Sequence, residues 1–155
     1  SRYSLTRRWV DKICQLMILH TDIVGKWEIN RSIRDIINKK EFKLSGNGIF
    51  TNKNNIFHYK ETGLLKSDKF ESKAHQEYTW IIKPNGWIIN FSDGNHFHDL
   101  ELENTEQEVY HECGNDIYKG MFLLNLPRNF EVMWEVSGPR KNYKSHTYYN
   151  KEIGR

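Results

Sequence analysis

Short segments of alternating apolar and polar residues follow one another through most of the chain, and turn-forming residues separate them. The turn signals include Pro84-Asn85-Gly86, Asp93-Gly94 and Gly114-Asn115, which are typical of tight hairpins. A long meander of hairpin-linked strands removes its exposed edges by closing into a barrel, so we predict an all-β, antiparallel up-and-down barrel of about eight to ten strands. The expected strands cover residues 24–33, 41–51, 54–62, 75–83, 86–92, 95–102, 107–113, 116–125, 129–138 and 142–150.

Two stretches depart from this strand pattern. Residues 5–21 carry apolar side chains at helical spacing, with Leu5, Trp9 and Ile13 on one side, which predicts an N-terminal α-helix. Residues 63–74 hold several charged side chains, and we expect an irregular, solvated connection there. The expected organisation is a single globular domain, with a tail and helix over residues 1–23 and the barrel over residues 24–155.

Charge and cysteine content narrow the classes of function. The net charge is only +3, and residues 84–118 hold eight acidic residues without a Lys or Arg, so we expect no nucleic-acid partner. Apolar runs stay well short of about 18 residues, so we expect no membrane span. Cys14 and Cys113 do not form the disulfide framework of a secreted domain, which favours an intracellular protein, cytoplasmic or mitochondrial.

Polar side chains interrupt the strand pattern between residues 91 and 118. Side chains alternate with period two along a strand, so polar residues from three neighbouring strands are expected to form one inward-facing patch. Tyr59 and Glu61 are expected to reach the same interior from an earlier strand. The members of the patch are His98, His111, Cys113, Asp116 and Tyr118.

A metal centre is one alternative for this patch. The period of two predicts His96 and His98 on one strand face, about 7 Å apart. His111 would then complete a three-ligand set of the kind that zinc accepts. Buried polar groups more often find protein partners, so the preferred interpretation is a hydrogen-bonded interior, and we predict neither a metal nor a cofactor.

The order of motifs resembles a known family. Gly25-Lys26-Trp27 opens the first expected strand, as the Gly-x-Trp signature does in lipocalin-like (calycin) barrels. In those folds the Trp packs over the closed barrel end under a basic residue, a role open here to Arg140, Lys141 and Lys151. The wider series resembles a lipocalin-like family catalogued as a domain of unknown function, which implies the fold and brings no activity. That series is Gly25-x-Trp27, Tyr59-x-Glu61-x-Gly63, Tyr78-x-Trp80, Phe91-x-Asp93-Gly94-x-x-Phe97-His98, His111-x-Cys113-x-x-Asp116-x-Tyr118 and Trp134-x-Val136-x-Gly138-Pro139-Arg140-Lys141.

Three functions remain open, and ligand binding is the leading one. A non-catalytic domain would hold a small ligand in a semi-polar barrel cavity. An acid–base enzyme would use His111, Asp116 and Tyr118 for proton transfer. An accessory subunit would dock into a larger assembly through helix 5–21 and the basic termini. The expected ligand-binding residues are His98, His111, Cys113, Asp116, Tyr118, Trp80, Trp87, Trp134, Arg140 and Lys141.

The turn 138–141 carries two of these residues, Arg140 and Lys141. It could bind an anionic headgroup at the barrel mouth. The preferred role is structural, with one of the two cations closing the barrel over Trp27.

Overall fold

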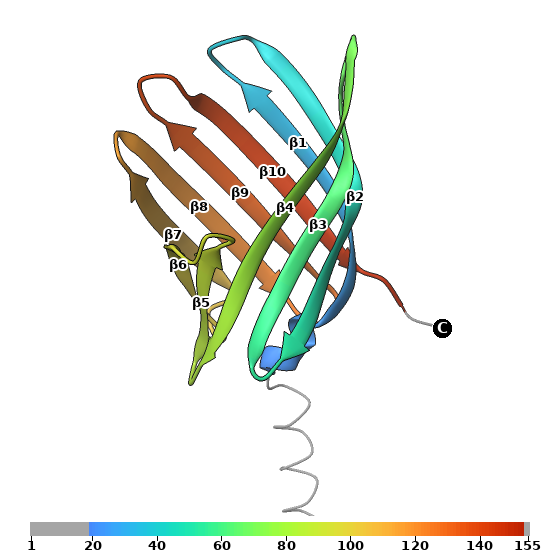
Figure 1. Cartoon of the computed structure of the whole chain (residues 1–155), viewed down its shortest axis with the longest axis vertical. Helices are drawn as coiled ribbons and strands as arrows, with labels where there is room; N and C mark the ends of the chain where they lie inside the picture. Colours follow the sequence, from blue (N-terminus) through green and yellow to red (C-terminus); the bar gives the residue numbers. More distant parts are fainter. Residues whose placement is uncertain (1–18, 154–155) are drawn as a thin grey trace, which may run out of the picture.

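The computed structural model describes residues 19–153, which form one ten-stranded antiparallel sheet curled into a nearly closed barrel (Figure 1). This architecture confirms the predicted all-β up-and-down barrel. A short 3₁₀ helix, η1 (His20–Ile23), precedes the strands. The strands are β1 (Gly25–Asp35), β2 (Lys40–Lys53), β3 (Ile56–Ser67), β4 (Phe70–Lys83), β5 (Gly86–Phe91), β6 (His96–Glu101), β7 (Glu106–Cys113), β8 (Asp116–Asn125), β9 (Asn129–Ser137) and β10 (Asn142–Lys151).

The barrel closes along a seam between β6 and β7. The strand order is β6-β5-β4-β3-β2-β1-β10-β9-β8-β7, so these two consecutive strands stand at opposite edges of the sheet. Gln107 connects them, because its side-chain nitrogen donates to the backbone oxygen of Glu101 and its side-chain oxygen accepts from the backbone nitrogen of Glu101. One side chain thereby makes the pair of hydrogen bonds that a backbone would make in an antiparallel ladder.

The opposite ends of the barrel differ, and η1 closes the lower one in Figure 1. Trp27 is fully buried there, and its indole nitrogen donates to the Ile23 oxygen at 2.8 Å. The Lys151 ammonium lies 4.7 Å from the centre of the Trp27 ring and donates to two carbonyl oxygens around η1. Gly25 has φ +128°, a backbone conformation that favours glycine. A Cβ at this position would also lie 2.9 Å from the Lys151 Cε atom, so a larger residue would crowd the Lys151 side chain.

Lys151 is therefore the basic residue over Trp27. The prediction that a cation of the turn 138–141 closes the barrel over Trp27 is wrong. In the pairing of β1 with β10, Trp27 faces Lys151 and Asp35 faces Tyr143. The turn follows β9 and precedes Tyr143, so it lies at the other end of the barrel from Trp27. Neither Arg140 nor Lys141 is positioned to cover the Trp27 ring.

The expected irregular connection over residues 63–74 is also wrong. Strand β3 continues to Ser67 and β4 begins at Phe70, with Leu64 paired to Lys73 in a long hairpin. Lys66 and Lys73 are exposed and occupy outward positions of these strands. Because a strand with one solvated face carries charges at every second position, its composition resembles that of a loop.

The helix expected over residues 5–21 lies almost entirely outside the described residues. Of that range the structure describes residues 19–21, where His20 and Thr21 belong to the 3₁₀ helix η1. The α-helix therefore does not extend to residue 21 as predicted. Among residues 19–153 no helix combines the length and the apolar character that crossing a membrane requires.

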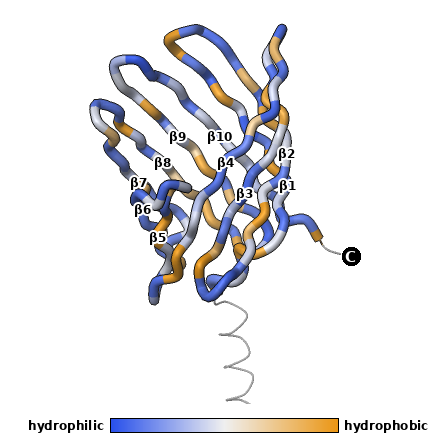
Figure 2. Tube along the Cα trace, in the orientation of Figure 1, coloured by the Kyte–Doolittle hydropathy of each residue, from blue (hydrophilic) through white to orange (hydrophobic). Residues whose placement is uncertain are grey.

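Apolar and polar residues alternate along the strands (Figure 2). The buried positions follow the same alternation, as Trp27 and Ile29 do on β1, so the apolar side chains face the interior. Near η1 this interior is packed with aromatic rings. Trp27 meets Phe130 edge-on at 4.9 Å between ring centres, and Trp80 meets Trp87 at 5.4 Å. This packed layer forms the floor on which the cavity described next rests.

Candidate ligand-binding site

A cavity of about 240 Å³ lies inside the barrel above this floor. Eleven of its 21 lining residues are Phe, Tyr or Trp. The volume falls slightly below the range of about 300–1,000 Å³ that is usual for drug-sized ligands. The polar lining residues other than tyrosines are Arg31, Glu61, Gln76, His98, Ser145 and Thr147.

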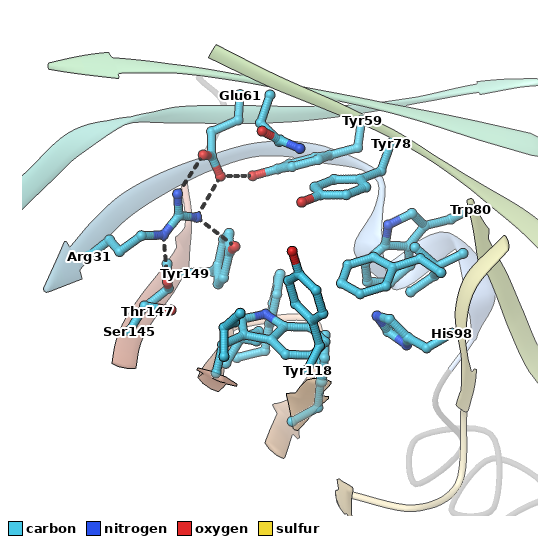
Figure 3. A pocket seen from close by; sticks show the side chains of 18 of the residues that line it. Arg31, Tyr59, Glu61, Tyr78, Trp80, His98, Tyr118, Ser145, Thr147 and Tyr149 are labelled. Carbon is cyan, nitrogen blue, oxygen red and sulfur yellow. Dashed lines mark hydrogen bonds and ion pairs between the residues drawn. The ribbon is translucent and has the colours of Figure 1, made fainter. Parts of the chain in front are cut away.

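An arginine and a glutamate pair inside the barrel (Figure 3). The Arg31 guanidinium donates to both carboxylate oxygens of Glu61, at 2.7 and 2.8 Å. It also donates to the Thr147 hydroxyl at 2.7 Å and to the Tyr149 hydroxyl at 3.2 Å. The Tyr59 hydroxyl donates to Glu61 at 2.7 Å. We call Arg31, Tyr59, Glu61, Thr147 and Tyr149 the polar cluster.

Strand register brings the polar cluster together. Arg31 follows Trp27 and Ile29 in the inward phase of β1, and it pairs directly with Thr147 on β10. Glu61 on β3 pairs with Gly48 on β2. A Cβ at Gly48 would lie 2.5 Å from the Tyr59 ring, so the glycine leaves the space that this ring occupies.

The polar cluster holds one cation and one anion. Burial alone would lower the pKa of Arg31, but Tyr149 and Glu61 more than offset burial and the pKa lies above its ordinary value. Burial raises the pKa of both Tyr59 and Tyr149, so these phenols stay protonated at neutral pH. The bidentate contact with Arg31 identifies Glu61 as the carboxylate partner.

His98 lines the cavity across from the polar cluster (Figure 3). Its residue is 5% exposed, and burial lowers the pKa of the imidazole to about 4, so the ring is neutral at pH 7. The His98 Nδ1 atom lies 3.2 Å from the backbone oxygen of Asp99. A carbonyl oxygen only accepts, so Nδ1 carries the hydrogen and Nε2 is left as an acceptor.

A β-bulge decides which side chains of β6 point inward. Ile89 pairs with His98 but the next residue, Asn90, pairs with His96, so Phe97 is the extra residue. Phe97 and His98 are both buried, whereas the exposed His96 ring contacts the Asp99 carboxylate at 2.8 Å. The expectation that His96 and His98 share a face is therefore wrong. Among residues 19–153 no group of three metal-ligating side chains comes together.

The structure brings four of the predicted ligand-binding residues to the cavity: Trp80, His98, Tyr118 and Trp134. Two further predicted residues lie outside its lining. Trp87 is buried in the floor against Trp80, and the His111 ring packs against Phe91 and Phe97 at 5.5 and 5.2 Å between ring centres.

The remaining predicted residues lie near the ends of β7 to β10. Cys113 and Arg140 are exposed. Asp116 lies 3.6 Å from the Lys141 ammonium, and its carboxylate packs where a Cβ of Gly138 would stand. The His111 ring centre is 5.7 Å from that of Tyr118, but the carboxylate of Asp116 is directed to Lys141 rather than to the imidazole.

Arg31, Thr147 and Tyr149 are not singled out by the sequence analysis, and Tyr78 is named there only in the motif Tyr78-x-Trp80, although all four line the cavity. Tyr59 and Glu61 reach the interior as expected. The sequence does contain a signal for Arg31. It lies two positions after Ile29 and four after Trp27 on the same strand, so it is expected to face the interior with them. An inward-facing cation on one strand and an inward-facing anion on another, here Arg31 and Glu61, together indicate an ion pair in the barrel interior.

The fold is similar to solved structures of low sequence identity. S-type phycobiliprotein lyase CPES from Guillardia theta has a TM-score of 0.61 at 8% identity, over 88% of this chain and 92% of that chain. A protein of unknown function of the DUF3598 family from Nostoc punctiforme has a TM-score of 0.53 at 9% identity, over 86% of this chain and 48% of that chain. These likenesses show the fold alone.

Sequence comparison adds the family. No curated protein matches the chain. A family model matches residues 23–151, which begin at the last residue of η1 and end with β10. This match confirms the expected membership of a family of unknown function. The chain belongs to DUF6314, a family of unknown function.

Proposed function

We propose that this protein is a non-catalytic binding domain whose barrel cavity holds a small ligand. The observation that carries the proposal is the cavity of about 240 Å³, in which aromatic walls surround a few polar groups. Binding sites for small molecules have this composition, because apolar walls supply affinity and a few fixed polar groups supply orientation. The similar fold of a phycobiliprotein lyase agrees with a barrel that holds a ligand.

The hydrogen bonding of the interior also favours binding over catalysis. The Glu61 carboxylate is occupied by Arg31 and Tyr59, and Asp116 is directed to Lys141. His111 lies outside the cavity lining. An acid–base enzyme needs its proton-transfer groups within hydrogen-bond reach of one bound substrate, and the predicted trio does not converge in this way.

The test uses β-naphthol, a flat aromatic alcohol, as the probe. Its binding is followed by NMR through the indole N–H signals of Trp80 and Trp134, which line the cavity, with fully buried Trp27 as the internal reference. We expect the signals of Trp80 and Trp134 to shift on titration while that of Trp27 stays in place.

Two matched variants localise that binding. Val132→Phe places a larger side chain in the cavity, and Met133→Phe makes the same kind of change at the adjacent, outward position of β9. Binding should be lost in the first variant and kept in the second. Equal binding in both, or unchanged signals of Trp80 and Trp134 in the wild type, would rule out the cavity as the site.

A further inference from the structure

We infer that the cavity selects an uncharged, flat aromatic ligand that donates a hydrogen bond to His98 Nε2. An arginine inside a barrel would at first suggest an anionic ligand, and the contacts of Arg31 argue against that. The inference rests on the proposed function, because it names the chemical class of ligand for the same cavity.

The first step is the charge of the polar cluster. Arg31 and Glu61 are joined by two parallel hydrogen bonds, and the exposed fractions of their side chains are 18% and 4%. The positive charge therefore already has a partner inside the barrel. A charged ligand would have to leave water without a free counter-charge in the polar cluster, which is costly.

The second step concerns the charged side chains near Tyr118 and the turn 138–141, at the end of the barrel opposite Trp27. Lys141 is another cation in this region, and its ammonium lies 3.6 Å from the Asp116 carboxylate. Lys141 and Asp116 therefore form a second balanced pair, and half of the Lys141 side chain is exposed to water. Neither this pair nor the polar cluster leaves an excess of positive charge that would attract an anion.

The third step is the pattern of donors and acceptors. The Nδ1 hydrogen of His98 is used by the Asp99 carbonyl, so Nε2 can accept from a ligand hydroxyl or N–H group. Figure 3 shows Arg31 on the opposite side of the cavity from His98. Four of the five guanidinium hydrogens of Arg31 are used by Glu61, Thr147 and Tyr149. We therefore assign the recognition of a ligand donor to His98 Nε2.

The fourth step is the shape of the walls. Phe97 and Trp134 are nearly parallel, with 15° between their planes and 5.0 Å between ring centres. Phe130 and Tyr149 are likewise parallel, at 8° and 4.1 Å. Rigid walls of this kind offer ring faces and edges against which a flat aromatic molecule can pack.

The test compares four naphthalene probes of nearly equal shape by the NMR titration described above. They are β-naphthol, unsubstituted naphthalene, the anion β-naphthoate and the cation β-naphthylmethylammonium. Naphthol should bind about threefold to tenfold more tightly than naphthalene, as one net hydrogen bond allows. Both ions should bind at least about tenfold more weakly than naphthol, because each carries an unbalanced charge into the barrel.

Two variants separate the parts of the inference. His98→Phe keeps a flat ring but removes the acceptor, so it should abolish the advantage of naphthol over naphthalene and leave naphthalene binding in place. Glu61→Gln keeps the shape and the acceptor for the Tyr59 hydroxyl but leaves Arg31 without its counter-charge. The ratio of naphthoate to naphthol affinity should then rise about tenfold.

Each outcome counts for or against a specific statement. Naphthoate binding as tightly as naphthol to the wild type, and losing that binding in Val132→Phe, would overturn the inferred ligand class while the proposed function stands. An unchanged preference for naphthol in His98→Phe would overturn the role of Nε2. If none of the four probes shifts the signals of Trp80 and Trp134, both proposals fail. Circular dichroism checks the fold of each variant, and the order of the probes on the wild type decides the ligand class even if Glu61→Gln does not fold.

Discussion

The side-chain amide of Gln107 bonds to both backbone groups of Glu101, at 2.8 Å to the nitrogen and 2.7 Å to the oxygen. The two residues belong to the edge strands β7 and β6, which are not paired with each other in the sheet. The same amide nitrogen also donates to the Asn104 carbonyl at 2.8 Å. Gln107 thus ties together both edges and the connection between them.

Gln107→Met should destabilise the fold by about 1–3 kcal/mol, because it leaves partly buried backbone groups of Glu101 without partners. Urea unfolding measures the change, and hydrogen exchange of the Glu101 amide should become faster. Glu108→Met is the matched control at the exposed neighbouring position and should stay within about 0.5 kcal/mol of the wild type. Equal stability of the two variants would contradict a closing role for Gln107.

Lys151→Met should cost about 1–3 kcal/mol in the free energy of unfolding. The substitution keeps the length of the side chain but removes the ammonium that lies over Trp27 and bonds to the carbonyl oxygens near η1. Lys26→Met is the control, since within residues 19–153 the Lys26 ammonium makes only an exposed ion pair with Glu152 at 3.5 Å, and it should cost less than about 1 kcal/mol. A loss in Lys26→Met as large as that in Lys151→Met would refute the assignment of Lys151 as the closing residue.

Arg31→Met should destabilise the protein by about 3–5 kcal/mol, because it leaves the Glu61 carboxylate buried without its partner. Adding Glu61→Gln removes that charge, so the double variant should be more stable than Arg31→Met alone. The exposed pair Lys60 and Glu77, 3.7 Å apart, provides the comparison cycle, with an expected coupling below about 0.5 kcal/mol. Additive effects of the Arg31 and Glu61 substitutions, measured by chemical unfolding, would exclude strong coupling.

Acid should destabilise the protein through His98. Its pKa of about 4 in the folded state lies below the usual value of 6.5, so the unfolded state binds more protons between these two values. This contribution is complete above about pH 6.5 and is lost as the pH falls, by about 2 kcal/mol between about pH 7.5 and about pH 5. His98→Phe should remove it, whereas His96→Phe should keep it because the His98 imidazole is retained. Identical pH dependence of stability in His98→Phe and the wild type would contradict the neutral buried imidazole.

The strands and hairpins could be predicted from the sequence because each depends on local chemistry. Alternation locates a half-buried strand, and a pair such as Asp93 and Gly94 locates a turn. The same local basis explains the error over residues 63–74, where Lys66 and Lys73 suggested a loop although they lie on the outer face of paired strands. Composition alone does not separate these two solvated environments.

The candidate site was harder to predict because it depends on register across strands. Arg31 and Glu61 are 30 positions apart and meet only once β1, β2 and β3 are aligned. Asp116 was grouped correctly with Tyr118 on one strand, but its carboxylate turns to Lys141, a contact that no strand pattern contains. His98 is placed correctly in the interior, and His96 is correctly left out of the inward patch. The expectation that the two share one strand face is wrong, because alternation assumes an uninterrupted ladder.

The extra residue at Phe97 has a consequence for reading related sequences. Without Phe97, His96 and His98 would be neighbours in β6 and both would keep their present faces, because adjacent residues of a regular strand point to opposite sides. A relative without the bulge could therefore carry the two histidines side by side and still hold one imidazole inside the barrel. The inward histidine is identified by its pairing with Ile89 on β5, and its distance along the chain from the outward histidine can differ by one residue.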